Sequence, residues 1–314
     1  MRIAAVVVSY NRSALLREAL AALEAQTRPL DAIVIVDNAS TDDSVAVARE
    51  LAPEADLVEL ARNTGGAGGF AVGLSRAMNR HGADLVWLMD DDTVPTPTAL
   101  EELLAARQRY GQDVALLASR VVWVNGADHP MNTPRPRPLL RRADRDRARH
   151  AEAVSVRSAS FVSCLVDTLA VRESGLPTAD YFIWNDDFEF TAKLLRRTTG
   201  LYCPRSIVVH KTKALASTDA DPGDRFYFEV RNKIWLFRHS RPFGPRDAAL
   251  YGVSTVLRWA RTFAKSSGRR TLWDGLRRGV RDGLRTPPRP NSTALADLGD
   301  DVVRDLAAVA ASGS

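Results

Sequence analysis

Residues 85–92 read Leu85-Val86-Trp87-Leu88-Met89-Asp90-Asp91-Asp92, a short apolar run that passes directly into three carboxylates. An apolar run of this length predicts a strand that is buried on both faces. Three adjacent carboxylates repel one another unless a cation or several hydrogen-bond donors offset their charge. Hard divalent cations prefer such oxygen ligands, and phosphate can supply further ones. We therefore expect a buried strand over residues 84–89 that ends at a metal- or phosphate-binding loop.

Three similar strands precede this one, and helical segments separate them. The strands are expected at Ile3–Val8, Ala32–Val36 and Leu57–Leu60. Such alternation predicts an α/β fold, with a mostly parallel central sheet flanked by helices. Ligands of such sheets bind beyond the carboxyl ends of the strands. Polar clusters stand at four of these ends: Ser9–Asn11, Asp37–Ser40, Asn63–Gly69 and Asp90–Asp92. We expect the four loops to converge on one edge of the sheet.

The second half of the chain is less regular. Strands are expected within Val114–Val124 and Ser155–Val171 and near Ile207–Val209, and a helix is expected over Arg225–His239. The segment between the first two, Pro130–His150, is rich in arginine and proline and predicts a mobile surface insertion.

Composition limits the class of protein. The 314 residues are 45% hydrophobic and 26% charged, which is typical of a globular chain. Its two cysteines form no CxxC pair, which argues against a disulfide framework or a zinc ribbon and favours a reducing compartment. The N-terminal apolar run is too short for a signal peptide, and no window reaches the roughly 18 apolar residues that a spanning helix needs. We expect a cytoplasmic protein that is soluble or peripheral.

The glycine cluster at residues 65–69 has two interpretations. Residues 66–71, Gly-Ala-Gly-Gly-Phe-Ala, fit the dinucleotide pattern G-x-G-x-x-A and would indicate an NAD(P)-dependent oxidoreductase. That pattern normally follows the first strand directly, whereas here it follows the third. Alternatively, the glycines let the backbone approach a ribose or a diphosphate at the start of a helix.

Two further features can carry chemistry. Asp186 and Asp187 stand beside Trp184, and neighbouring carboxylates in such a setting can hold a general base with a raised pKa. An acidic helix N-terminus is the plain alternative. His210 ends an apolar strand; a lone histidine there is more often structural, but imidazole suits a manganese-type ion if a metal site already exists.

Taken together, these motifs resemble those of the family 2 inverting glycosyltransferases of GT-A fold. The order is VVVSYNR, IVIVDNASTD, RNTGGAGGF, VWLMDDD, an acidic pair and a strand-end histidine, followed by the aromatic–Arg-Asn segment at residues 226–232. RNTGGAGGFAVG with VWLMDDD is most similar to the bacterial galactofuranosyltransferase and rhamnosyltransferase branch. The resemblance covers about residues 3–240.

The resemblance implies a role for each of these positions. The donor site would contain Ser9, Tyr10, Asp37, Arg62, Asn63, Gly65, Gly66, Asp90 and Asp91. Asp90, Asp92 and His210 would bind a divalent metal, Mn²⁺ or Mg²⁺. Asp187 would be the general base, with the choice between it and Asp186 left open, and Trp184 would face the acceptor.

The implied reaction is inverting transfer from a nucleotide-sugar donor of UDP-galactofuranose or dTDP-rhamnose type to a hydroxyl of a cell-envelope glycan or lipid-linked acceptor. An inactive sugar-nucleotide-binding protein is a further alternative. The implied catalytic domain covers residues 1–240, with a donor-binding part at about 1–125 and an acceptor-binding part at about 151–240.

Residues 241–314 are predicted to form a basic helical C-terminal extension. Residues 238–289 contain 13 Lys or Arg and three acidic residues. Val253, Val256, Leu257, Ala260 and Phe263 recur at helical spacing, and Leu272, Leu276 and Val280 do so in a second segment. Basic amphipathic helices can lie on anionic membrane at the inner face of the plasma membrane, or pack on the catalytic domain. No nucleic-acid-binding module accompanies the charge, so nucleic acid is not expected. The tail after Pro288 is expected to be loosely ordered.

Overall fold

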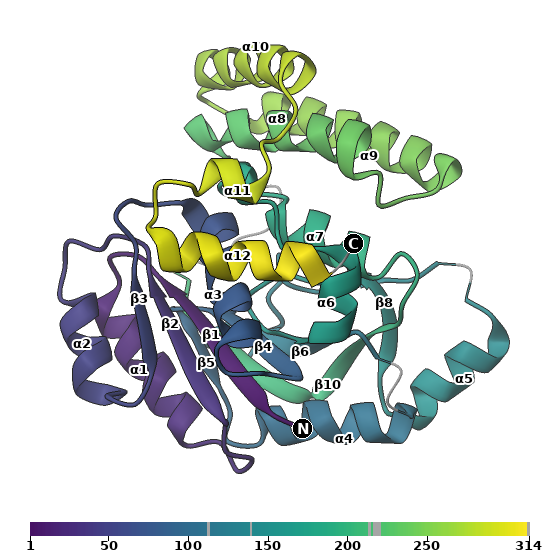
Figure 1. The fold of residues 1–314 in the computed structure, drawn as a ribbon. Coiled ribbons are helices and arrows are strands. Elements are labelled where there is room, and N and C mark those ends of the chain that lie inside the picture. Colours follow the sequence, from purple (N-terminus) through teal and green to yellow (C-terminus); the bar gives the residue numbers. More distant parts are fainter. Residues whose placement is uncertain (112–113, 139, 213–214, 216–220, 313–314) are drawn as a thin grey trace.

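A computed structural model describes residues 1–111, 114–138, 140–212, 215 and 221–312 (Figure 1). These residues form a ten-stranded sheet in the order β3-β2-β1-β4-β9-β6-β10-β8-β7, and β5 pairs with the end of β10. The strands are β1 (Ile3–Ser9), β2 (Ala32–Asp37), β3 (Asp56–Glu59), β4 (Leu85–Asp90), β5 (Thr93–Pro95), β6 (Leu116–Val122), β7 (Arg135–Pro136), β8 (Val154–Ser158), β9 (Cys164–Asp167) and β10 (Gly200–His210).

Most of the sheet is parallel. β1 pairs in parallel with β2 and β4, β2 with β3, and β10 with β6. β9 is antiparallel to both β4 and β6, and β8 is antiparallel to β10. The predicted mostly parallel α/β sheet is confirmed. Because β4, β6 and β10 run the same way, the carboxyl ends of β4 and β10 lie at one edge.

Helices cover both faces of the sheet (Figure 1). Alternate residues of β1 enter two cores: Val6 packs with α3, α6, α7 and α12, and Val7 packs with α1, α2 and α4. β1 is apolar at nearly every position because it is buried on both faces. The helices are α1 (Ser13–Glu24), α2 (Ser44–Leu51), α3 (Gly65–Asn79), α4 (Ala99–Tyr110), α5 (Arg142–His150), α6 (Thr168–Ser174), α7 (Asp186–Leu194) and α12 (Asp300–Ser312).

The prediction of a mobile insertion at Pro130–His150 is wrong. This segment contains β7 and α5, and Ala148 of α5 is buried in the same core as Leu103 of α4. Asn132 is also buried, at 8% exposure. The arginine-rich pattern hid these contacts because α5 buries only one of its side chains and exposes the charged ones.

The C-terminal region forms a helical layer and then returns to the sheet (Figure 1). The layer consists of α8 (Phe226–Trp235), a π-helical turn (Leu236–Ser240), α9 (Pro245–Lys265) and α10 (Arg269–Arg285). Gly279 of α10 lets that helix lie against α8, since a Cβ there would come 2.8 Å from Val230 Cβ. Short 3₁₀ turns lie at Ala179–Tyr181 and Gly223–Arg225.

The expectation of a loosely ordered tail after Pro288 is wrong. α11 (Asn291–Ala294) and α12 follow, and α12 packs along α3. Leu306 and Val309 of α12 are buried in the core that contains Val6. Helix α12 is therefore part of the helical layer that covers one face of the sheet. Within the described part of the chain, none of the helices has the length and apolar character that crossing a membrane requires.

Candidate active site

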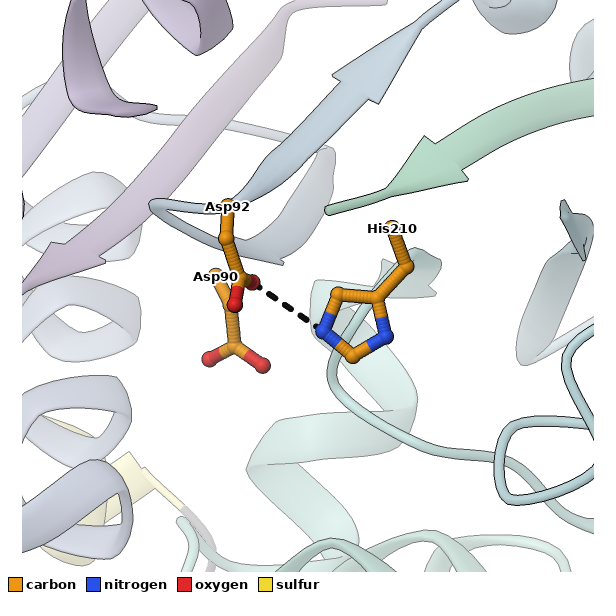
Figure 2. Close-up of side chains that lie close together, drawn as sticks. All are labelled: Asp90, Asp92 and His210. Atoms are coloured by element: carbon orange, nitrogen blue, oxygen red, sulfur yellow. Dashed lines mark ion pairs between the residues drawn. The ribbon is translucent and has the colours of Figure 1, made fainter. Parts of the chain in front are cut away.

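Three predicted metal ligands meet at the carboxyl edge of the sheet (Figure 2). Asp90 is the last residue of β4, Asp92 follows two residues later, and His210 is the last residue of β10. One ligand atom from each lies within 4.8 Å of the others. Residues more than a hundred positions apart are brought together because β5, directly after Asp92, pairs with β10.

The hydrogen bond of His210 to Asn132 orients the other ring nitrogen of His210 towards Asp92. His210 Nδ1 lies 2.9 Å from Asn132 Oδ1, an amide oxygen that can only accept, so Nδ1 carries the proton. In the neutral ring, the Nε2 lone pair then points at Asp92 Oδ1, 3.1 Å away. Asp92 Oδ1 is buried and has no hydrogen-bond partner of good geometry among the described residues. Two facing lone pairs need positive charge between them, which a proton on Nε2 or a divalent cation would supply.

Asp91 faces away from this cluster. Its carboxylate accepts hydrogen bonds from Ser9 Oγ at 3.1 Å, from the Tyr10 amide at 3.0 Å and from Arg12 at 3.2 Å. Burial raises the pKa of Asp91 to about 6, although Arg12 opposes that shift. Asp91 was expected in the donor site, and in this structure its carboxylate oxygens hold the loop after β1. Arg12, which also pairs with Asp92, was not identified from the sequence.

The ends of β1 and β2, with the loops that follow them, carry Ser9, Tyr10 and Asp37, three of the residues expected in the donor site. Asp37 Oδ2 accepts from the Ser40 amide at 2.9 Å, whereas Asp37 Oδ1 is buried without a hydrogen-bond partner among the described residues. Tyr10 is 44% exposed, so its ring is available to a ligand. Ser9 is fully buried and donates to Asp91, so it supports the loop.

Arg62 and Asn63 make intramolecular contacts. Arg62 makes two hydrogen bonds to Asp297, at 2.6 and 2.8 Å, and therefore turns towards the C-terminal segment. Arg62 was expected in the donor site, and in this structure its guanidinium pairs with Asp297. Asn63 Oδ1 accepts from the Gly65 amide at 2.7 Å and shapes the start of α3. Asn38 was missed: it bonds Thr64 and Gly65 and so joins the loop after β2 to the glycine loop.

The glycine cluster mostly serves packing. Gly65 has φ +69°, and a Cβ there would collide with the Phe182 carbonyl. A Cβ on Gly69 would come 2.5 Å from Val8, so that glycine lets α3 lie close to β1. Of the predicted donor-site pair Gly65 and Gly66, Gly66 lines the cavity described below. The G-x-G-x-x-A match therefore reflects packing of α3 on the sheet, which removes the main support for a dinucleotide site.

One cavity of about 680 Å³ joins the metal cluster to the acidic pair. The predicted site residues on its wall are Gly66, Asp90, Trp184, Asp186, Asp187 and His210. Asn132 and Asn185 also line it, as do Tyr251, Arg258 and Trp259 of α9. The C-terminal extension therefore contributes to the same cavity as the sheet edge.

The acidic pair begins α7. Burial, and next the charge of Asp187, raise the pKa of Asp186 well above its usual range. Burial also raises the pKa of Asp187, to about 6, against the hydrogen bond from the Phe188 amide and the charge of Lys233. A carboxylate with a pKa near 6 is deprotonated at neutral pH yet basic enough to take a proton. The surroundings therefore favour the neutral form more strongly at Asp186 than at Asp187.

The backbone before the acidic pair is held in a strained form. Phe182, Trp184 and Asn185 all have positive φ, between 64° and 68°. Such conformations persist only where the surroundings fix them. The Asn232 side-chain amide donates to three carbonyls of this loop, those of Tyr181, Ile183 and Trp184, at 2.7 to 2.9 Å. Asn232 belongs to the aromatic–Arg-Asn segment, which supplied a family resemblance but no predicted contact.

A buried charge network supports Asn185. Lys233, 1% exposed, donates to Asn185 Oδ1, and Glu229 Oε2 accepts from the Asn185 amide at 2.7 Å. Glu229 also accepts from Arg258 at 2.6 Å and from the Trp259 indole at 3.1 Å. α9 is thereby fixed to the loop that carries the acidic pair.

Comparison with known proteins agrees with this geometry. Residues 4–161 match the model of the family described as Glycosyl transferase family 2. The chain is 32% identical over 256 residues to galactofuranosyltransferase GlfT1 of Mycobacterium tuberculosis (strain H37Rv), which covers 74% of this chain and 81% of that protein.

Solved structures share the fold. S. aureus TarS 1–349 in complex with UDP-GlcNAc superimposes with a TM-score of 0.60 at 15% identity, covering all of this chain and 88% of that one. Mannosyltransferase PcManGT from Pyrobaculum calidifontis, in complex with GDP-Man and Mn²⁺, gives 0.52 at 18% identity, covering 99% and 86%. The fold is GT-A, and the chain belongs to glycosyl transferase family 2.

Proposed function

We propose that this glycosyltransferase moves a sugar, with inversion, from a nucleoside-diphosphate sugar to a hydroxyl of a cell-envelope glycan or lipid-linked acceptor. The observation that carries the proposal is the shared cavity, which is lined by Asp90 and His210 of the carboxylate–histidine cluster and by the Asp186–Asp187 pair. The relatives named galactofuranosyltransferase favour UDP-galactofuranose over dTDP-rhamnose as the donor type.

Donor binding would use the carboxyl edge of the sheet. Tyr10 and Asp37 would contact the base, the latter through its unsatisfied buried oxygen. Asp90, Asp92 and His210 would hold Mn²⁺ or Mg²⁺. When bound, such a cation neutralises charge on a diphosphate leaving group. The complexes of TarS with UDP-GlcNAc and of PcManGT with GDP-Man and Mn²⁺ support this use of the fold.

The transfer would be a single displacement. The acceptor oxygen bonds to the anomeric carbon while the bond from that carbon to the diphosphate oxygen breaks, and the diphosphate leaves with the electron pair. Asp187 takes the proton of the acceptor hydroxyl as a general base. Asp186, kept neutral by burial, orients the acceptor or its neighbour. Attack from the face opposite the leaving group inverts the anomeric configuration.

The test is a transfer assay with UDP-galactofuranose and dTDP-rhamnose in turn, in the presence of Mn²⁺, with mixed envelope glycans and lipid-linked saccharides as acceptors. We expect UDP-galactofuranose to be consumed, the product to carry the opposite anomeric configuration by NMR, and a chelator to abolish turnover. A product that retains the donor's configuration, or full turnover in excess chelator, would contradict the proposal.

We also propose a cytoplasmic location, with the acceptor presented at the inner face of the plasma membrane. The basic composition of residues 238–289 supports this. Fractionation of the native cell should recover the protein with the membrane and release part of it in high salt.

A further inference from the structure

The apolar stripe of α9 points into solvent. Leu250 is 71% exposed, Val253 and Val256 are each 61% exposed, and Leu257 is 53% exposed. With exposed Ala249, Ala260 and Ala264 they form a stripe about 120° wide at 3.6 residues per turn. We call this stripe the outer face of α9. Amphipathic helices of globular proteins normally turn such a stripe inward, and a contiguous exposed one indicates a binding surface.

The inward side of α9 fixes this orientation. Tyr251 accepts a hydrogen bond from buried Lys233 at 3.0 Å, and Arg258 and Trp259 both donate to Glu229. Phe263 packs edge-on against Phe226, with ring centroids 5.6 Å apart. The helix cannot rotate its apolar stripe inward without burying Glu229 and Lys233 unpaired, which is strongly unfavourable.

Basic side chains surround the outer face. Arg246 and Arg261 are exposed on the same helix, and Arg270 is exposed at the start of α10. Trp273 of α10 is 57% exposed, and its ring lies 6.2 Å from that of Phe263, at the edge of the stripe. An apolar stripe bordered by arginines and a tryptophan matches a lipid surface, where tryptophan and arginine favour the headgroup level.

We propose that the outer face of α9 docks on the surface of an anionic lipid bilayer, with Leu250, Val253 and Leu257 entering the acyl boundary. A second copy of the chain is a poorer occupant, because a two-fold contact through this stripe would bring the flanking arginines of both copies together. Anionic headgroups offset that charge instead. The docking surface does not depend on the identity of the transferred sugar.

The proposal gives α9 two roles on opposite sides. Its inward residues Tyr251, Arg258, Trp259 and Thr262 line the cavity that holds the acidic pair, while its outer face contacts lipid. Because α9 is a single helix, docking would set that cavity one helix diameter, roughly 10 Å, from the bilayer surface. An acceptor carried by lipid would reach the cavity without leaving the membrane.

The experiment measures co-sedimentation of the full chain with vesicles of phosphatidylcholine alone or mixed with phosphatidylglycerol. Leu250→Ser with Leu257→Ser removes two apolar contacts, and Arg261→Gln removes one charge. Leu169→Ser is the matched control, because Leu169 on α6 is also 71% exposed but lies outside the stripe. Circular dichroism and hydrolysis of the nucleotide-sugar donor in solution check that each variant is folded.

We expect the wild-type chain and Leu169→Ser to bind mixed vesicles and to bind phosphatidylcholine weakly. The double serine variant should lose on the order of tenfold or more in binding, and Arg261→Gln about fivefold. Unchanged vesicle binding by the folded double variant would overturn the proposal. So would a wild-type dimer in sedimentation that the double variant dissociates, with no vesicle binding by either. Donor hydrolysis in solution should be unchanged in all three, so failure of docking and failure of the glycosyltransfer proposal are distinguishable.

Discussion

Asp186 and Asp187 are neighbours in the chain, yet their surroundings separate them. Asp187 accepts from the Phe188 amide and feels the charge of Lys233, and both contacts favour its ionised form. Asp186 is more deeply buried and meets the charge of Asp187, which favours its neutral form. This difference favours Asp187 as the proposed base.

Asp187→Asn keeps the size of the side chain but cannot accept a proton. It should lower kcat by about 10²–10⁴-fold, the usual contribution of a positioned base. The donor Kd should change little, because the proposed donor contacts lie elsewhere, at Asp37, Asp92 and His210. Steady-state kinetics and donor titration check both values. Asp186→Asn should lower kcat by less. If Asp186→Asn is the inactive variant and Asp187→Asn is active, the assignment within the pair is wrong.

The pKa of Asp187, raised to about 6, predicts a pH profile. A base must be deprotonated, so kcat should be maximal above pH 7 and fall about tenfold per unit below pH 6. Asp91 also has a pKa of about 6, but it holds the loop after β1 and takes no proton from the acceptor. The kcat of Asp91→Asn should therefore still fall below pH 6. The residual kcat of Asp187→Asn should not fall there. If kcat of Asp187→Asn still falls below pH 6, the base lies elsewhere.

Among the elements, the loop before α7 depends most on one side chain. Asn232→Ala removes three hydrogen bonds from a segment with positive φ at Phe182, Trp184 and Asn185. The loop should relax and misplace the acidic pair, lowering kcat on the order of tenfold to a hundredfold. The free energy of unfolding should drop by about 1–3 kcal/mol. Asn79→Ala, which removes one bond to the Asp305 carbonyl, should affect stability alone. Equal kcat in both variants would contradict the positioning role of Asn232.

The packing of α12 gives a second test at this scale. Leu306 is 3% exposed in the core that contains Val6, so Leu306→Ala should lower the free energy of unfolding by about 2–5 kcal/mol. Ala308→Ser on the exposed side of the helix should stay within about 0.5 kcal/mol. Denaturant unfolding compares the two. Similar values would mean that α12 is not part of the core.

For the whole molecule, local patterns predicted the sheet and two members of the carboxylate–histidine cluster. β1, β2 and β4 are apolar at nearly every position because both their faces are covered, and Asp90 and Asp92 follow directly from that pattern. The roles expected for Asp187 and His210 came from the resemblance. The meeting of His210 with Asp90 depends on the pairing of β5 with β10, which no local pattern encodes.

The contacts that the sequence did not predict share one physical cause. The direction in which a side chain or a helix face turns is decided by partners that are distant in sequence. Asn132 lies in an arginine-rich segment, and its bond to His210 comes from tertiary contact. The stripe of α9 left open whether its apolar side packs on the domain or faces outward, and the contacts of Glu229 and Lys233 with the polar side of that helix decide the orientation. Arg62 likewise turns to Asp297, more than two hundred residues away.

The central claim is that the carboxyl edge of the sheet binds a nucleoside diphosphate through a divalent cation. Calorimetric titration of UDP into the protein, with Mn²⁺ or with a chelator, tests it most directly, and NAD serves as the rival ligand. We predict UDP binding that needs Mn²⁺, that weakens on the order of tenfold or more in Asp92→Asn, and that is unchanged in the control Asp300→Asn. UDP binding of equal strength in chelator and in Asp92→Asn, or binding of NAD in its place, would contradict the account.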